Sequence, residues 1–236
     1  PKFKSISLPA PQFSEKSKKL PKNYFTQKTF ASKPDILLIS NKFNRFPFSC
    51  SGGTNRIDFI DKFKAGIRSI VLKAKEKDNS IVIKVYSKNR YELLKSFWNE
   101  MKSIGGNKYK IYDSWDKGLS TKLLTTAKLI VWDQIGTGTL QCFTANIPSI
   151  VYWERFHSRE TNWSKPYIKG LEDVGIVHNS LDTLFTEIDN FIRDPILWMN
   201  DRKRRDAIDL FNKRYAYTDK KWIKIWNKQI KRNFLQ

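Results

Sequence analysis

Short apolar runs alternate with segments of helical period through most of this chain of 236 residues. The clearest runs are Ile36–Ile39, residues 81–86 and Leu129–Trp132, where apolar side chains stand at nearly consecutive positions. Such runs are typical of strands that are buried on both faces. Between the first two, apolar residues recur at helical spacing over residues 57–74. Strands that alternate with helices in this way predict an α/β fold with a Rossmann-like, doubly wound parallel sheet.

The other expected elements continue this alternation. Further strands are expected at residues 109–112, 148–153 and 175–178, and further helices at residues 91–101, 119–126 and 181–192 and in a segment that ends at Ala145. Two helical segments, residues 195–215 and 219–234, follow the last strand. A basic cluster at residues 202–205 is expected to form a solvated helix face.

We expect three parts along the chain. Residues 1–34 contain five prolines and no helical period, which predicts an arm or interdomain linker whose isolated aromatic residues dock on a surface. Residues 35–193 form the Rossmann-like domain, and residues 194–236 form C-terminal helices that pack on it. Apolar residues make up 40% of the chain, which is enough for a core and excludes general disorder.

Lysine and arginine outnumber acidic residues by 44 to 23, which gives a formal net charge of +21. This excess favours an anionic partner such as a nucleotide, a nucleic acid or an anionic membrane surface. The basic residues are spread along the sequence, so a general lysine-rich composition explains the charge equally well. Two histidines and two distant cysteines provide no paired ligand spacing, and we expect neither a metal site nor a cofactor.

The segment 127–154 carries the most specific chemistry of the sequence. A buried strand is followed by a tight turn with Gly136, Thr137, Gly138 and Thr139, and this turn opens a helix. Backbone N–H groups at a helix N-terminus have no partner within the helix and carry the positive end of its dipole. Because glycines let a phosphate approach and threonine hydroxyls add donors, one interpretation is a phosphate or diphosphate site. The alternative is a structural turn whose threonine caps the helix.

Several blocks of this region together resemble a known group of enzymes. They read LLTTAKLIVWD at residues 123–133, GTGTLQ at residues 136–141, NIPSIVYW at residues 146–153 and LEDVGIVH at residues 171–178. The pattern resembles a family of bacterial cell-surface polysaccharide transferases, specifically the C-terminal half of the two-Rossmann-domain glycosyltransferase plan, GT-B. The resemblance covers residues 108–217. A looser similarity to CDP-glycerol glycerophosphotransferases covers the same strand, turn and helix.

The resemblance implies that this domain binds a nucleotide-sugar donor and holds its diphosphate at the helix N-terminus. The residues that would form the donor site are Asp113, Ser114, Asp133, Gly136, Thr137, Gly138, Thr139, Glu154 and Arg155. Glu154 would hydrogen-bond a ribose or sugar hydroxyl. His157 is a weak catalytic candidate, because it lies in a polar loop with Arg155. His178 and Cys142 are expected to be packing residues.

The resemblance further implies a transferase that moves the sugar to a glycan or lipid-linked acceptor in cell-surface polysaccharide biosynthesis. The general base of such enzymes belongs to an N-terminal Rossmann domain, for which this chain has no room, so we expect that domain to be missing from it. The expected location is the cytoplasm, with peripheral contact at the inner face of the membrane. Two alternatives stay open: a glycerophosphotransferase that uses CDP-glycerol, and a non-catalytic, basic nucleic-acid-binding protein.

The last predicted helix is amphipathic. Trp222, Ile225, Trp226 and Ile230 share one broad face, and lysines cover much of the rest. Such a stripe most often packs as core, on this domain or on a partner domain. The alternative is contact with a membrane, where lipid-linked acceptors reside.

Overall fold

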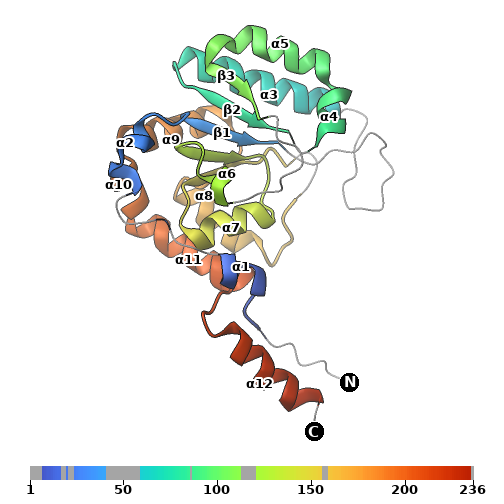
Figure 1. The fold of residues 1–236 in the computed structure, drawn as a ribbon, viewed down its shortest axis with the longest axis vertical. Coiled ribbons are helices and arrows are strands. Elements are labelled where there is room, and N and C mark those ends of the chain that lie inside the picture. Colours follow the sequence, from blue (N-terminus) through green and yellow to red (C-terminus); the bar gives the residue numbers. More distant parts are fainter. Residues whose placement is uncertain are drawn as a thin grey trace.

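The computed structural model describes residues 7–16, 20, 24–40, 59–85, 87–112, 121–155 and 159–234. Its centre is a six-stranded sheet in which all neighbouring strands are parallel. The strands are β1 (Ile36–Ile39), β2 (Ile81–Lys84), β3 (Tyr109–Ile111), β4 (Leu129–Trp132), β5 (Ser149–Tyr152) and β6 (Val177–His178). Their order across the sheet is β3-β2-β1-β4-β5-β6 (Figure 1).

This strand order confirms the predicted Rossmann-like, doubly wound sheet. The chain moves outward from β1 to β3, returns to the other side of β1 with β4 and continues to β6. Each predicted apolar run contains one of these strands. The last strand begins at Val177 instead of residue 175, because Gly175 has a positive φ of 72° and closes the turn after the preceding helix.

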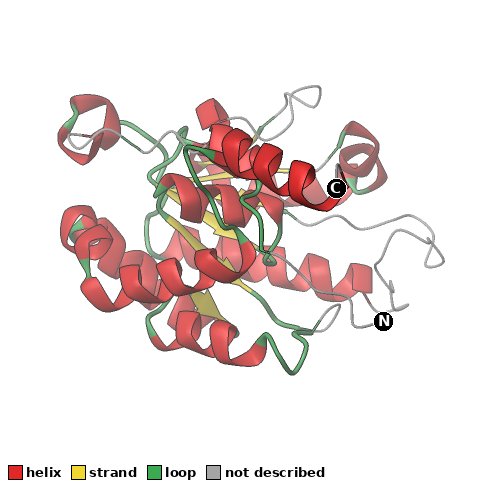
Figure 2. Cartoon of the chain, turned by 90° about the horizontal axis from the view of Figure 1, so that it is seen from below, coloured by secondary structure: helices red, strands yellow, loops and turns green. Residues whose placement is uncertain are grey.

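Helices cover both faces of the sheet, which explains why its strands are apolar at consecutive positions. The helices that surround it are α3 (Phe59–Glu76), α4 (Lys88–Leu93), α5 (Lys95–Gly105), α6 (Thr121–Leu124), α7 (Thr137–Ala145), α8 (Lys165–Asp173), α9 (Leu181–Arg193), α10 (Pro195–Asn200) and α11 (Arg202–Tyr215). Figure 1 shows α3 and α5 on one side of the sheet and α7, α8 and α11 on the other. α3 packs against α5 and α9, whereas α11 packs against α7 and α8. Figure 2 shows the strands enclosed between helices from a second direction.

Two aspartates set where the C-terminal helices begin. Asp194 accepts a hydrogen bond of 2.8 Å from the N–H of Leu197 at the start of α10. Asp201 accepts one of 2.8 Å from the N–H of Arg204 at the start of α11. Because Asp201 caps a new helix, the single segment predicted at residues 195–215 is two helices.

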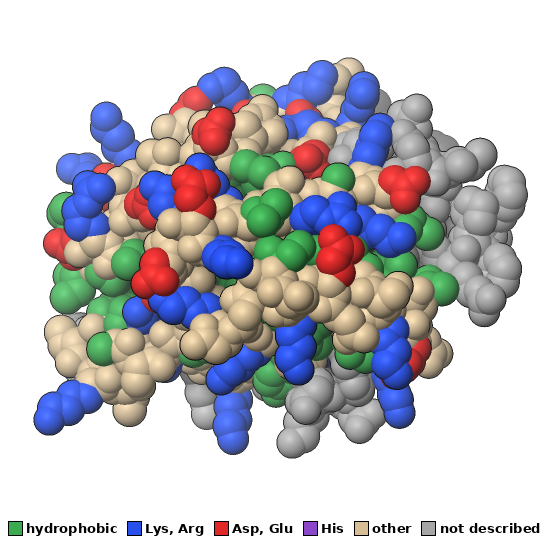
Figure 3. All heavy atoms as spheres, turned by 90° about the horizontal axis from the view of Figure 1, so that it is seen from above, with side chains coloured by type: hydrophobic (Ala, Val, Ile, Leu, Met, Phe, Trp, Pro, Cys, Tyr) green, Lys and Arg blue, Asp and Glu red, His purple; other side chains and the backbone are tan. Residues whose placement is uncertain are grey.

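Charged side chains are spread over the face that Figure 3 shows, where basic and acidic groups stand among one another. Several of them form ion pairs at the surface. Arg68 and Glu100 join α3 to α5 at 2.7 Å, and Lys77 pairs with Asp189 of α9 at 2.8 Å. Exposed pairs of this kind contribute little stability each, so the buried apolar core carries most of it.

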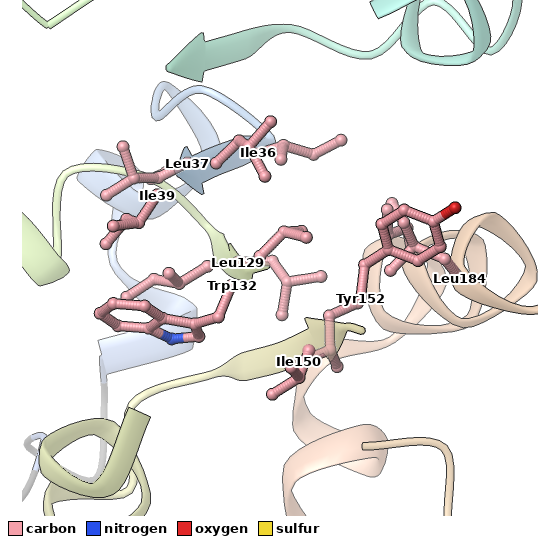
Figure 4. Close-up of a cluster of buried hydrophobic side chains, with 14 of the residues drawn as sticks. Ile36, Leu37, Ile39, Leu129, Trp132, Ile150, Tyr152 and Leu184 are labelled. Carbon is pink, nitrogen blue, oxygen red and sulfur yellow. The ribbon is translucent and has the colours of Figure 1, made fainter. Parts of the chain in front are cut away.

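The core lies on both faces of the sheet. All four residues of β1, β4 and β5 are buried. In the parallel register Ile39 pairs with Trp132, so the two side chains share a face of the sheet. Figure 4 shows Trp132 in this cluster, and Tyr152 beside Leu184 of α9.

The N-terminal segment docks on the domain through its aromatic residues, as the sequence predicts. It contains α1 (Pro11–Lys16), the 3-10 helix η1 (Tyr24–Thr26) and α2 (Lys28–Ala31). Phe13, Tyr24 and Phe30 are buried. Tyr24 and Phe30 meet edge to face, with ring centroids 5.6 Å apart.

The last helix, α12 (Trp222–Phe234), lies apart from the sheet and extends away from the domain in Figure 1. α1 packs against it, and the indole N–H of Trp226 donates to the carbonyl of Pro9 at 2.8 Å. α10 and α11 thus pack on the domain, whereas α12 packs on the N-terminal segment. Within the described residues, no helix is both long enough and apolar enough to cross a membrane.

Candidate functional site

The carboxyl ends of all six strands lie at one edge of the sheet, because every strand pair is parallel. The direction of winding reverses between β1 and β4, which are neighbours. In open α/β sheets, ligands bind outside the carboxyl ends of the strands at such a switch point. The turn after β4 leads to α7 and therefore lies at this position.

α7 begins with an open N-terminus at that edge. Gly136 is the N-cap, with an extended backbone (φ −154°, ψ −171°) and no side chain to cap the helix. The first helical hydrogen bond runs from the N–H of Leu140 to the carbonyl of Gly136 at 3.1 Å. The N–H groups of Thr137 and Gly138 consequently have no acceptor within the helix. A Cβ built on Gly136 meets no atom of the described residues within 4 Å, so these residues leave room for an anion beside the N-cap.

The two threonines of the turn differ in their surroundings. Thr139 is buried; its hydroxyl accepts the N–H of Gly136 at 3.3 Å and donates to the carbonyl of Gln134 at 3.2 Å. Its hydroxyl therefore holds the turn rather than adding a donor for a ligand. Thr137 is exposed at the first helical position.

Glu154 lies beyond the carboxyl end of β5 and is exposed. Its Oε1 accepts a hydrogen bond of 2.8 Å from the hydroxyl of Tyr152, and burial, followed by this carboxylate, raises the pKa of Tyr152. Its Oε2 lies 3.4 Å from the place where a Cβ on Gly66 of α3 would stand. A surface cavity of about 370 Å³ opens beside them, lined by Lys62, Ala65, Gly66, Ser69, Tyr152, Glu154 and Leu181. The carboxylate can thus accept hydroxyl groups from a ligand in this cavity.

Arg155, predicted to bind the donor, has its charge compensated within the chain. Its Nε lies 3.0 Å from Glu160, and its guanidinium also pairs with Glu172 of α8. The same guanidinium lies 4.9 Å from the ring centroid of Trp153. Arg155 also has a positive φ of 61°, which is uncommon for a residue with a side chain. These contacts pair the guanidinium of Arg155 with carboxylates of the chain itself, at the start of the segment that joins β5 to α8.

The other predicted site residues have separate outcomes. Asp133 follows β4 directly and is partly buried beside the turn that opens α7. Asp113, Ser114 and His157 lie outside the described residues. Within the described residues, no group of three or more His, Cys, Asp or Glu side chains could hold a metal ion.

The structure also places two buried polar residues at the carboxyl edge of the sheet that the sequence analysis did not include in the site. Lys84 ends β2, is 5% exposed and lies 5.2 Å from the ring centroid of Tyr112, and burial lowers its pKa. Ser40 follows β1 and is 2% exposed, and its Oγ has no hydrogen-bond partner in the part of the chain that the structure describes. In the sequence, the one sign of a role for Lys84 is that this lysine ends an otherwise apolar strand.

His178 and Cys142 are packing residues, as predicted. His178 is buried at the end of β6, with Nε2 3.0 Å from the carbonyl of Gly175. Cys142 is fully buried in α7, and burial raises the pKa of its thiol.

Residues 2–230 match the model of a family described as LIC12162 family transferase. The chain belongs to this family. The match includes all four sequence blocks that carry the resemblance to surface-polysaccharide transferases, and it confirms that resemblance at the level of a transferase family. No curated protein matches this LIC12162-family chain.

Two solved structures of UDP-GlcNAc 2-epimerase from Methanocaldococcus jannaschii align with this LIC12162-family chain. The first, in complex with UDP-GlcNAc and UDP, has 16% sequence identity and a TM-score of 0.44 over 85% of this chain and 49% of its own length. The second has 16% identity and a TM-score of 0.42 over 81% of this chain and 49% of its own. The chain spans about half the length of these structures.

Proposed function

We propose that this chain binds the nucleotide-sugar donor of a transferase that builds cell-surface polysaccharide. The observation that carries the proposal is the open N-terminus of α7 at the switch point of the sheet. There the N–H groups of Thr137 and Gly138 have no helical partner, and a Cβ on Gly136 would meet no described atom within 4 Å. Membership of a transferase family supports the same reading.

The diphosphate of the donor would lie against this turn. When a sugar is transferred, the bond between its anomeric carbon and the diphosphate oxygen breaks, and negative charge develops on the leaving nucleoside diphosphate. Fixed N–H donors and the positive end of a helix dipole stabilise that charge as it forms. The ammonium group of Lys84, buried at the end of β2, adds positive charge at the same edge of the sheet.

Glu154 would hold the ribose or the sugar of the donor. Its exposed carboxylate borders the cavity between α3 and β5, and the Tyr152 hydroxyl fixes one of its oxygens. Carboxylates at such positions accept hydrogen bonds from paired hydroxyls. The acceptor would be a glycan or a lipid-linked glycan. The general base that deprotonates the acceptor hydroxyl would come from a second Rossmann domain that faces the donor site.

A thermal-shift screen of the full chain against UDP, GDP, CDP, CMP and dTDP at two salt concentrations tests this function. A nucleoside diphosphate that occupies a defined site raises the melting temperature by mass action, and the shift survives moderate salt. We expect one base to be preferred. Preference for cytidine nucleotides would point to an alditol-phosphate donor of the CDP-glycerol kind instead of a sugar donor.

The same screen contains the outcome that contradicts the proposal. Equal shifts with all nucleotides that vanish at higher salt would indicate a merely basic surface, as would steeply salt-dependent binding of a random oligonucleotide. Either result would favour the nucleic-acid-binding alternative.

A further inference from the structure

α12 carries an apolar row whose two ends are left exposed by the part of the chain that the structure describes. Ile223 is 55% exposed and Ile230 is 43% exposed. The two are seven residues apart, which places them on the same face two turns apart, with Trp226 between them. α1 covers the neighbouring side of the helix, where Trp226 donates to the carbonyl of Pro9. Of the stripe predicted to pack as core, Trp222, Ile225 and Trp226 are half-buried and Ile230 is exposed, so the stripe is only partly packed.

The charge around this row has a single sign. After Asp219 the sequence contains no acidic residue, and its six basic residues from there on are Lys220, Lys221, Lys224, Lys228, Lys231 and Arg232. All six are exposed. Lys224, Lys228 and Lys231 follow one another at helical spacing and form a row of their own along the flank of α12.

The position of α12 in the molecule leaves this helix accessible to a partner. In Figure 1, α12 extends away from the sheet and its covering helices, whereas α1, on which it packs, also contacts α7. Ile223, Ile230 and the three lysines are all exposed, so an extended object such as a bilayer can reach both rows.

We propose that α12 docks on an anionic lipid surface. A helix with tryptophan and isoleucine on one side, and with lysines and no acidic residue on the polar side, lies in the plane of the headgroups, with its apolar row among the upper acyl chains. The cations attract anionic headgroups, and tryptophan favours this interface. The charge excludes a basic partner and matches a negative surface. This inference does not depend on the donor site.

Co-sedimentation of the full chain with vesicles tests the docking. One set of vesicles contains phosphatidylcholine and phosphatidylglycerol, and the other contains phosphatidylcholine alone. We expect binding to the anionic vesicles, weakened by salt, and at least about tenfold weaker binding to the neutral ones.

Two variants separate the apolar and the charged contributions. Ile223→Glu with Ile230→Glu should lower partition to anionic vesicles about tenfold or more, with Leu210→Glu, an exposed leucine on α11, as the matched control that leaves binding unchanged. Lys224→Gln with Lys228→Gln and Lys231→Gln should reduce both binding and its salt dependence. Its control is Lys75→Gln with Lys102→Gln and Lys110→Gln, which are exposed lysines elsewhere.

Three results would overturn the proposal. The first is equal binding to neutral and anionic vesicles, and the second is unchanged binding by the isoleucine variant. The third is that the unmodified chain does not bind vesicles but self-associates in analytical ultracentrifugation, and that the isoleucine variant abolishes this self-association. The last result would make the row an interface between copies. Circular dichroism during heating checks that each variant is folded. Vesicle binding is measured well below the melting temperature of every variant, so a lowered melting temperature does not by itself reduce binding.

Discussion

The guanidinium of Arg204 is held from several sides. It donates to Glu187 at 2.6 Å and to the carbonyl of Trp198 at 2.7 Å, and it lies 4.1 Å from the Trp198 ring centroid. Burial lowers the pKa of Arg204. The sequence placed residues 202–205 on a solvated helix face, because nothing in a short basic run reveals that one member turns toward partners on α9 and α10.

Removing this guanidinium should destabilise the fold. Arg204→Ala leaves the carboxylate of Glu187 without its cation in a site where both side chains are largely buried. We expect a loss of about 3 kcal/mol in the free energy of unfolding, measured with urea. Arg202→Ala is the matched control, since Arg202 is 94% exposed and should change stability by less than about 0.5 kcal/mol. Equal effects of the two substitutions would contradict the buried role.

His178 should make stability depend on pH. Burial lowers the pKa of His178 below its ordinary value of 6.5, outweighing its contact with the Gly175 carbonyl and the carboxylates of Glu187 and Glu172. The unfolded chain therefore binds more protons below pH 6.5 than the folded chain does, so the free energy of unfolding falls as the pH falls through that value. The slope from this group cannot exceed about 1.4 kcal/mol per pH unit.

Replacing the imidazole tests this account. His178→Gln should flatten the dependence of the free energy of unfolding on pH between pH 7.5 and 5.5. Urea unfolding of the variant and the unmodified chain at several pH values measures it. A His178→Gln chain that keeps the full slope would show that other groups cause it.

At the scale of the element, the turn before α7 combines a structural and an open part. Thr139 closes it from inside by two hydrogen bonds, and Thr137 and Gly138 leave N–H groups at its outer end. The sequence presented these as alternatives, a structural turn or a phosphate site. The two roles fall on different residues, since the buried Thr139 holds the turn and Thr137 is exposed, whereas Gly138 is buried and offers only its backbone N–H.

Thr139→Val should therefore cost stability. Valine has the same shape but leaves the N–H of Gly136 and the carbonyl of Gln134 without their partner, and we expect a loss of about 2 kcal/mol in the free energy of unfolding. Thr137→Val is the control and should change it by less than about 0.5 kcal/mol, because Thr137 is exposed. Urea unfolding without nucleotide compares them. Similar losses from both would mean that the inner hydrogen bonds do not hold the turn.

The positions of whole elements followed from the sequence more closely than their ends did. Burial on both faces makes each strand a continuous apolar run, which is why β1 and β4 lie at their predicted residues. Helix ends depend on caps, and Asp201 divides one predicted helix into two. Leu94 likewise separates α4 from α5 within a region predicted as a single helix. Such breaks follow from local hydrogen bonds that periodicity alone does not show.

For the whole molecule, strand order decides where a ligand can bind. Alternation of strands and helices predicted the parallel sheet, and the sheet places the α7 turn, Lys84 and Ser40 at one edge. The candidate site was less predictable than the fold. Arg155 shares a loop with Glu160 and meets Glu172 of α8, and only the folded chain shows that these carboxylates compensate its charge. Lys84 and Ser40 became candidates for the site only because the structure shows that both are buried.

The central claim is that a donor diphosphate lies against the N-terminus of α7. Gly136→Asp tests it most directly. An aspartate at the N-cap accepts the helix N–H groups itself, so the fold keeps its stability while the anion loses its donors. Gly170→Asp on α8, where a Cβ also meets no described atom within 4 Å, is the matched control for the added charge.

The measurement is isothermal titration calorimetry of the unmodified chain and both variants with UDP, GDP, CDP and dTDP. We expect Gly136→Asp to weaken the preferred nucleotide by about 2 kcal/mol, about thirtyfold in Kd, and Gly170→Asp to bind it as the unmodified chain does. Unchanged affinity in the Gly136→Asp chain would show that the diphosphate does not bind at this turn.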